Sequence, residues 1–296
     1  MKSKTIMLAA AIAVSQTAFA QNSSTTVIVP ETGAASNASV ASSNLNQGEQ
    51  SKIAPRIKYL GVVRGPGLEF SGAQQSAVND SAQLNYEQRV KVLGTFGSNF
   101  EAGVEARVNT NFGKGNTLNA TAGNWRLLAN FKNVYKDDVF ALNLIPRIYL
   151  PTSKSAHNAG TAVSPDLIAN FSISPKDSKF SFDSGVEYLQ FFHNDNENPA
   201  TAKKALTAEL DPWLEADYQL TPKTQLMIAY WPSLQAHARQ GAPLANTSNE
   251  IDIGANYELA KGWTLTPFVS SEPNGLDTAS PLKNMQLMVL VSGTVL

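Results

Sequence analysis

The stretch Phe100–Phe112 (FEAGVEARVNTNF) constrains the fold most, because two kinds of side chain alternate along its whole length. Phenylalanine, alanine, valine and threonine occupy the even positions, and glutamate, glycine, arginine and asparagine occupy the odd ones. A period of two is the side-chain period of a β-strand. At roughly 3.3 Å per residue and a tilt of about 40°, the two terminal phenylalanines are about 30 Å apart along a membrane normal. This stretch therefore predicts a strand long enough to cross a bilayer.

The same pattern recurs through the rest of the chain, and no segment shows a convincing helical period. Strands are predicted at 54–64, 84–96, 99–112, 124–135, 138–150, 166–174, 179–192, 204–220, 223–239, 249–259, 263–271 and 284–296. Long connections (65–83, 113–123, 151–165, 193–203, 240–248 and 272–283) alternate with tight turns (97–98, 136–137, 175–177, 221–222 and 260–262). Twelve strands, with long loops at one rim and tight turns at the other, predict an all-β fold, an antiparallel up-and-down transmembrane β-barrel.

Aromatic residues support this prediction, because they recur on the apolar face near both ends of the strands. Beside the tight turns these are Phe96, Phe100, Tyr135, Phe140, Phe180, Tyr218, Tyr257 and Trp263, and at the other rim Tyr86, Phe112, Trp125 and Phe192. Paired aromatic girdles are typical of a membrane-spanning wall. A soluble periplasmic β-sandwich also alternates its faces and remains an alternative. Pro146, Pro212, Pro232 and Pro267 lie inside predicted strands, where we expect bulges or breaks near the rims.

Residues 1–20 have the features of a signal peptide. Lys2 and Lys4 precede a short apolar run at 6–14, and Ala18 and Ala20 suit cleavage before Gln21. Residues 21–50 are rich in small polar residues and predict a disordered periplasmic segment. The barrel is expected over 51–296. There is no cysteine, which excludes a lipoprotein anchor and a disulfide framework.

This organisation resembles the bacterial outer-membrane porin-like β-barrels over residues 52–296. The resemblance rests on the signal sequence, the strand pattern and the loops, and no family-specific motif accompanies it. It implies a place in the bacterial outer membrane in contact with its lipid, and insertion by the envelope barrel-assembly machinery. Such barrels typically end in an aromatic residue, whereas this chain ends in Leu296.

If the apolar faces meet lipid, the polar faces line the interior, where charge is segregated by strand. The expected pore-lining residues are Arg56, Lys58, Arg89, Lys91, Glu105, Arg107, Arg126, Lys132, Arg147, Asp183, Glu187, Glu209, Asp211, Glu215, Asp217 and Asp252. The first five strands supply a basic wall, and strands seven, eight and ten an acidic one. Opposed walls of charge select solutes by sign. The sequence therefore predicts a channel for small hydrophilic solutes or ions, with a closed structural barrel as the alternative.

Other classes of function have weaker support. Without Lys2 and Lys4 the chain has 21 basic and 24 acidic residues, a net charge of −3, and we expect no nucleic-acid partner. A hydrolase needs a nucleophile and a base in contact, whereas Ser233 and His237 are four residues, about 13 Å, apart along one strand. His157 and His193 lie in loops. Asp195, Asn196 and Glu197 match no calcium loop, so no catalytic residue, metal or cofactor is expected. Trp213, Trp231 and Phe268 have interior parity, which leaves a sugar-binding slide open.

Overall fold

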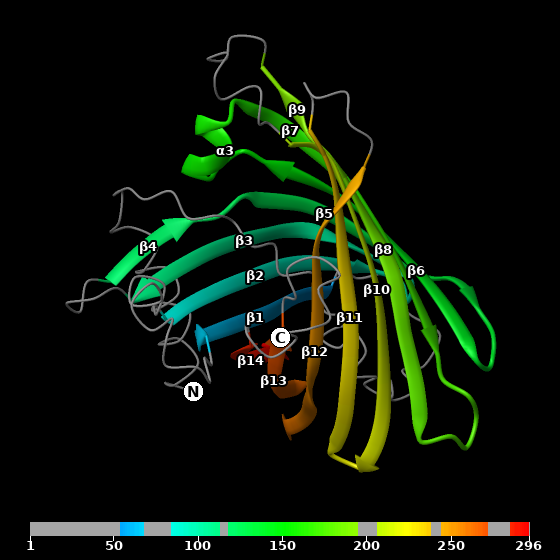
Figure 1. The fold of residues 1–296 in the computed structure, drawn as a ribbon. Coiled ribbons are helices and arrows are strands. Elements are labelled where there is room, and N and C mark those ends of the chain that lie inside the picture. The colour runs from blue at the N-terminus through cyan, green and yellow to red at the C-terminus, as the bar shows by residue number, and fades with distance from the viewer. Residues whose placement is uncertain are drawn as a thin grey trace, which may run out of the picture.

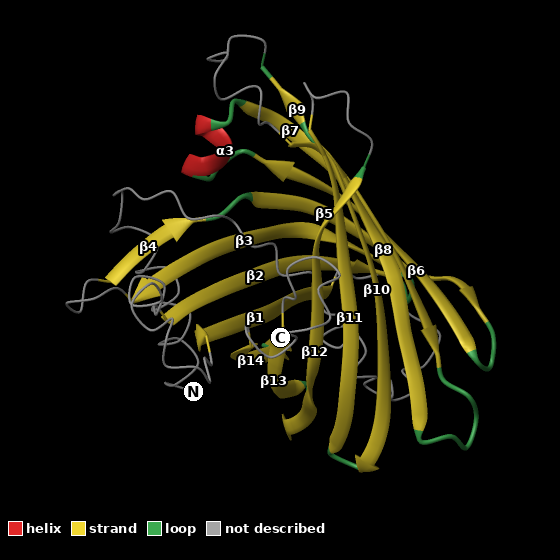
Figure 2. Cartoon of the chain, viewed as in Figure 1, coloured by secondary structure: helices red, strands yellow, loops and turns green. Residues whose placement is uncertain are grey.

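The computed structural model describes residues 54–67, 84–112, 118–194, 206–237, 244–271 and 285–295. The predicted signal peptide, the segment 21–50 and residues 195–197 lie outside this range. Most of the described chain forms β-strands (Figures 1 and 2). These are β1 (Ala54–Gly67), β2 (Leu84–Phe96), β3 (Phe100–Phe112), β4 (Leu118–Ala122), β5 (Trp125–Lys136), β6 (Phe140–Leu150), β7 (Thr161–Ile173), β8 (Phe180–Gln190), β9 (Phe192–His193), β10 (Leu206–Thr221), β11 (Thr224–His237), β12 (Ala245–Ala260), β13 (Trp263–Ser271) and β14 (Met285–Thr294).

These strands close into a barrel of twelve wall positions. Each strand pairs antiparallel with its neighbour along the chain, and β1 pairs with both β2 and β14, so no edge remains. Two short strands add no wall position: β4 pairs with the outer half of β3, beyond the part that pairs with β5, and β9 pairs with the start of β7. The predicted twelve-stranded antiparallel barrel is confirmed. In the described part of the chain, no helix is long and apolar enough to cross a membrane.

Predicted and observed strands differ mainly at the long-loop rim. The connection expected at 113–123 contains β4, and the one expected at 151–165 contains a short helix, α3 (Lys154–Asn158), and the first residues of β7. Ser153 caps α3 by accepting the backbone N–H of Ala156, a local interaction that no periodicity reveals. β7 begins early because its first residues pair with β9. The loops are therefore shorter than predicted because some of their residues extend the sheet.

The two faces of the strands are sorted as the alternation predicts. In β3, Glu101 and Glu105 are 0% and 1% exposed, whereas Val104 is 42% exposed. With Val104, twenty-nine large apolar side chains of the described residues are exposed, which suits a wall that faces lipid and is the reverse of a soluble sandwich. A sandwich would bury Val104 and leave Glu105 in water. The charged side chains therefore fill the interior of the barrel.

Aromatic rings form a girdle beside the tight turns. Phe100 lies between Phe96 and Phe131, with ring centroids at 5.6 and 5.0 Å. Two further ring pairs join neighbouring strands, Tyr135 with Phe140 and Phe180 with Tyr218. A third, Tyr59 with Trp263, joins β1 and β13, the strands on either side of β14. At the other rim Phe112, Trp125 and Phe192 are exposed. Both girdles lie on the outer face, as predicted, and mark the two membrane interfaces.

The four strand prolines do not end their strands, and one of them, Pro232, lies next to the register shift between Ser233 and Leu234 in the β11–β12 ladder. Each is paired on one side: Pro146 with Leu167, Pro212 with Val186, Pro232 with Asn249 and Pro267 with Val289. On the other side each falls in a short gap between paired residues, in the β5–β6, β10–β11 or β12–β13 ladder. Pro212 and Pro232 face each other across the β10–β11 gap. The missing N–H donors are thus confined to three gaps in the ladders. The expected bulge is found beside Pro232, whereas no described strand ends at a proline.

Candidate functional site

All sixteen predicted pore-lining residues lie on the inward face of the barrel. Twelve of them are buried, none more than 6% exposed, and Arg56, Lys58, Lys91 and Lys132 are partly exposed. The order of strands in the closed sheet places β2 six positions from β10, and β3 six positions from β11. The basic strands therefore lie opposite the acidic ones, as Figure 1 shows for β1 to β3 and β10 to β12. The two predicted walls are present.

Glu101 is the central anion of the basic wall near the tight turns. Its carboxylate contacts the Arg56 guanidinium at 2.8 Å, the Lys58 ammonium at 3.5 Å and the Lys132 ammonium. Glu101 lies on β3. Arg56 and Lys58 come from β1, which pairs with β2, and Lys132 comes from β5, which pairs with β3. Three partly exposed cations thus surround one fully buried carboxylate, which compensates in part for its removal from water.

Two further glutamates repeat this arrangement deeper in the barrel. Glu87 contacts both Arg89 and Arg107, and Glu105 contacts Arg126 at 3.2 Å and Lys91 at 3.4 Å. Glu87 and Glu101 were not among the sixteen predicted residues, although strand parity places both inside. The basic wall is therefore a network in which each carboxylate serves two or more cations.

Arg147 on β6 joins the two walls. Its guanidinium pairs with both Asp166 on β7 and Glu187 on β8, and it lies over the Tyr149 ring together with Arg126, whose Cζ is 4.2 Å from the ring centroid. Asp166 was missed by the sequence analysis. Its parity with Ile168 and Asn170, which also face inward, is the signal that would have found it.

Apart from the ion pair of Glu187 with Arg147, the acidic wall includes carboxylates with neutral partners. Glu209 accepts hydrogen bonds from Gln235 at 2.7 Å and Ser233 at 3.2 Å, and Glu250 accepts one from Ser270 at 2.7 Å. Glu215 is fully buried and lies directly opposite Asp183 in the β8–β10 ladder. Like charges in this position repel each other. The acidic wall therefore concentrates negative charge that hydroxyl and amide groups stabilise.

Apolar side chains also face the interior. The rings of Trp213 and Trp231 stack at 5.4 Å between centroids, and Ile168, Met227 and Ala229 pack with them. The Trp213 ring lies flat against Gly185 of the neighbouring strand, where a Cβ would approach Cζ2 to 2.2 Å. A second cluster comprises Val62, Phe268, Met288 and Leu290. The predicted interior parity of the tryptophans and Phe268 is confirmed, but the tryptophan rings are buried against each other and Phe268 is buried in the second cluster, which gives no support to a sugar slide.

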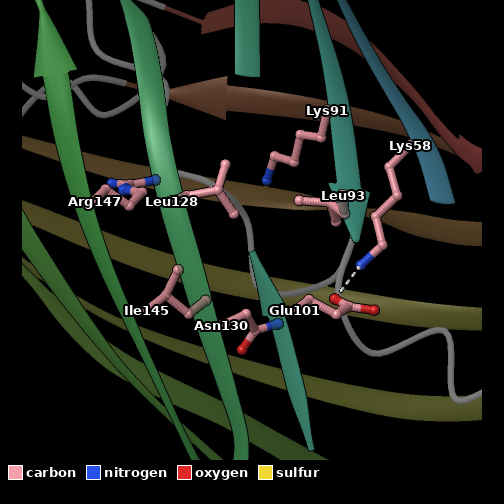
Figure 3. Close-up of a pocket in the computed structure, with 8 residues that line it drawn as sticks. All are labelled: Lys58, Lys91, Leu93, Glu101, Leu128, Asn130, Ile145 and Arg147. Atoms are coloured by element: carbon pink, nitrogen blue, oxygen red, sulfur yellow. Dashed lines mark hydrogen bonds and ion pairs between the residues drawn. The ribbon is translucent and has the colours of Figure 1, made fainter. Parts of the chain in front are cut away.

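One pocket opens on the basic wall (Figure 3). Lys58, Lys91, Glu101, Asn130 and Arg147 supply its polar lining. Its apolar lining consists of Leu93, Leu128 and Ile145, and Ile145 also packs against the tryptophan cluster. The pocket thus combines positive charge with a small apolar surface.

No catalytic constellation emerges among the described residues. Ser233 lies beside Glu209, and the side chain of His237 lies outside the described part. His193 directs Nε2 at the backbone oxygen of Leu206, 2.8 Å away, and His157 lies exposed on α3. Within the described ranges, no group of three or more histidine, aspartate or glutamate residues is arranged to hold a metal ion.

Comparison with solved structures places this fold among outer-membrane proteins. An outer membrane channel from Pseudomonas putida F1 superimposes with a TM-score of 0.55 at 13% identity, over 85% of this chain and 100% of that one. The protein has the porin-like barrel architecture. The NanC porin (TM-score 0.45, 9% identity, 80% of this chain and 98% of that one) and the KdgM porin (TM-score 0.42, 10% identity, 80% of this chain and 98% of that one) are less similar. No family model and no curated protein matches the chain.

Proposed function

We propose that this protein is an outer-membrane channel for passive diffusion of small hydrophilic solutes or ions, with selectivity set by its two charged walls. The observation that carries the proposal is the inward face of the closed barrel, which places arginine and lysine on β1 to β6 opposite aspartate and glutamate on β8, β10 and β12. Charged walls in a pore create a field that favours solutes by sign and orients dipolar ones. The role is one of transport, without catalysis.

The proposal includes the route to the membrane. We expect residues 1–20 to direct export and to be removed before Gln21, residues 21–50 to remain in the periplasm, and the barrel to be inserted into outer-membrane lipid by the envelope assembly machinery. Mass spectrometry of protein purified from outer-membrane fractions tests this. A mature mass that begins at Gln21 supports it, and recovery in the soluble periplasm contradicts it.

A closed structural barrel is the second candidate, and the tight burial of the interior favours it. Twelve of the sixteen predicted pore-lining residues are no more than 6% exposed, and two apolar clusters occupy the same interior. Side chains that fill a lumen leave no water path, as in the smallest barrels. The two candidates predict different electrical behaviour.

Conductance of the purified protein in a planar bilayer distinguishes them. A channel produces discrete current steps, and its reversal potential in a salt gradient shifts toward anion preference in Asp211→Asn and Glu215→Gln, because each removes negative charge from the interior. Asp138→Asn, in the exposed turn between β5 and β6, is the matched control and should leave selectivity unchanged. Silence at high protein density in the bilayer supports the closed barrel and overturns the channel.

A further inference from the structure

The pocket on the basic wall has two lysines that face each other on neighbouring strands. Lys58 of β1 lies directly opposite Lys91 of β2 in the ladder, and both side chains enter the pocket (Figure 3). Like charges in this position repel each other. The nearest carboxylates are shared: Glu101 also serves Arg56 and Lys132, and Glu105 also serves Arg126. Among these described residues, five cations adjoin two carboxylates, a surplus of three positive charges.

The two pocket lysines lie at the long end of the ion-pair distances on the basic wall. Lys58 and Lys91 lie 3.5 and 3.4 Å from their carboxylates, whereas Arg56 lies 2.8 Å from Glu101. Their side chains remain 34% and 23% exposed. An ammonium with three donors on a flexible stem can turn toward a second anion without leaving its first partner. The pocket therefore offers a site for negative charge.

The rest of the lining is apolar and is contributed by three different strands. Leu93 of β2, Leu128 of β5 and Ile145 of β6 face the same space as the lysines, and Leu93 and Leu128 point toward each other across it (Figure 3). Leu93 and Leu128 are 3% and 8% exposed. A simple inorganic ion would make no contact with this lining, whereas an apolar tail that enters the pocket would pack against it and leave water itself.

Access to the pocket is from the tight-turn rim. Exposure along the basic wall rises in that direction: Arg89 and Arg126 are 1% and 2% exposed, whereas the side chain of Arg56 is 42% exposed. Lys132 marks the rim itself, because its backbone N–H donates to the oxygen of Asn99 in the β2–β3 turn. A solute can therefore reach the lysines from this end without crossing the buried network.

We propose that this pocket binds small amphipathic organic monoanions, with the acid group at the ammonium groups of Lys58 and Lys91 and the apolar tail on Leu93, Leu128 and Ile145. As a statement about transported solutes, it rests on the proposed channel function. Binding itself requires only the folded barrel. The pocket is then a binding site along the path of the solute, and it favours anions with an apolar body over inorganic anions.

Titration calorimetry of the full-length protein in nonionic micelles tests the binding, with hexanoate as the probe and protein-free micelles as the blank. We expect hexanoate to bind at least tenfold more tightly than acetate, which has the acid group alone, and hexylammonium, which has the tail with the opposite charge, to give no signal. Affinities of hexanoate and acetate within twofold of each other, or no binding of hexanoate, overturn the proposal.

Variants locate the site. Lys91→Gln and Lys58→Gln should each weaken hexanoate binding about tenfold, and Ile145→Thr should weaken hexanoate but leave acetate unchanged. Lys223→Gln, in the exposed β10–β11 turn, is the matched control and should bind like the parent. Unchanged affinity in both pocket lysine variants overturns the proposal, and the comparison of probes on the parent protein decides the matter if a variant fails to fold.

Bilayer recordings separate this proposal from the channel itself. Current steps that hexanoate blocks more strongly than acetate, from the tight-turn side, support both. Hexanoate binding without conductance overturns the channel and leaves the pocket in place. Conductance without hexanoate binding overturns the pocket alone.

Discussion

The two walls of the interior stabilise their charged groups in different ways. On the basic wall every central carboxylate lies between cations, as Glu87 does between Arg89 and Arg107. On the acidic wall Glu187 pairs with Arg147, but other carboxylates face hydroxyl and amide groups or one another, as Glu209 faces Ser233 and Gln235. The basic wall is therefore a network of mutual dependence, whereas the acidic wall accumulates charge of one sign.

This difference decides what the removal of a charge does. A carboxylate taken from the basic wall leaves buried arginines with less compensation, which is costly in a medium of low polarity. A carboxylate neutralised on the acidic wall relieves repulsion. The same chemical change, from acid to amide, should thus have opposite signs on the two sides of one barrel.

The largest effect is expected for Glu87→Gln. It leaves Arg89 and Arg107 buried without their shared anion, and breaking a buried ion pair typically costs about 3–5 kcal/mol. The free energy of unfolding in urea, followed by the loss of the folded band on unheated gels, measures the change. Glu250→Gln, whose carboxylate accepts from Ser270 and contacts no cation in the described ion pairs, is the matched control. A loss below about 1 kcal/mol would contradict the network.

Gly185→Ala should destabilise the acidic side of the barrel by about 1–3 kcal/mol, the usual cost of overpacking. The added Cβ would approach Trp213 Cζ2 to 2.2 Å and the Ala169 backbone oxygen to 2.5 Å, neither of which yields easily. Gly123→Ala is the counterpart on the basic side. There the Cβ meets the Arg107 side chain at 2.7 Å, which is flexible, so we expect a smaller loss. If the urea midpoint fell equally in Gly185→Ala and Gly123→Ala, the rigidity of the Trp213 ring could not be the cause of the destabilisation.

Glu215→Gln should leave stability unchanged or raise it by up to about 1 kcal/mol, because it removes one of two directly opposed buried carboxylates. Comparison with Glu87→Gln under identical urea conditions tests the contrast between the walls. A loss for Glu215→Gln as large as that for Glu87→Gln would end the distinction, since it would mean that the acidic wall also depends on each of its charges.

The smallest effect on stability is expected outside both walls, in the turn between β5 and β6. Asp137, in the turn between β5 and β6, accepts the backbone N–H groups of Phe140 and Val139 at 2.7 and 2.8 Å, and these hydrogen bonds lower the pKa of its carboxyl. Its contribution to the turn is therefore present above the pKa of the unfolded chain and is lost as the pH falls through the lowered value. Hydrogen exchange of the two amides should lose protection over that range, and Asp137→Ala should lose it at every pH. Pronounced pH dependence in Asp137→Ala would contradict the assignment.

The sequence by itself determined the barrel, because a period of two along strands such as Phe100–Phe112 fixes which side chains share a face, and lipid outside makes polarity a direct indicator of that face. It also located the girdles and both charged walls. Only the tertiary structure decided which charges meet. Arg147 pairs with Asp166 and Glu187 on the next two strands, and Pro212 lies opposite Pro232, because the register between strands sets these neighbours and no local period encodes it. Burial of the interior was equally a tertiary result, since it depends on how far side chains from opposite walls fill the space that twelve strands enclose.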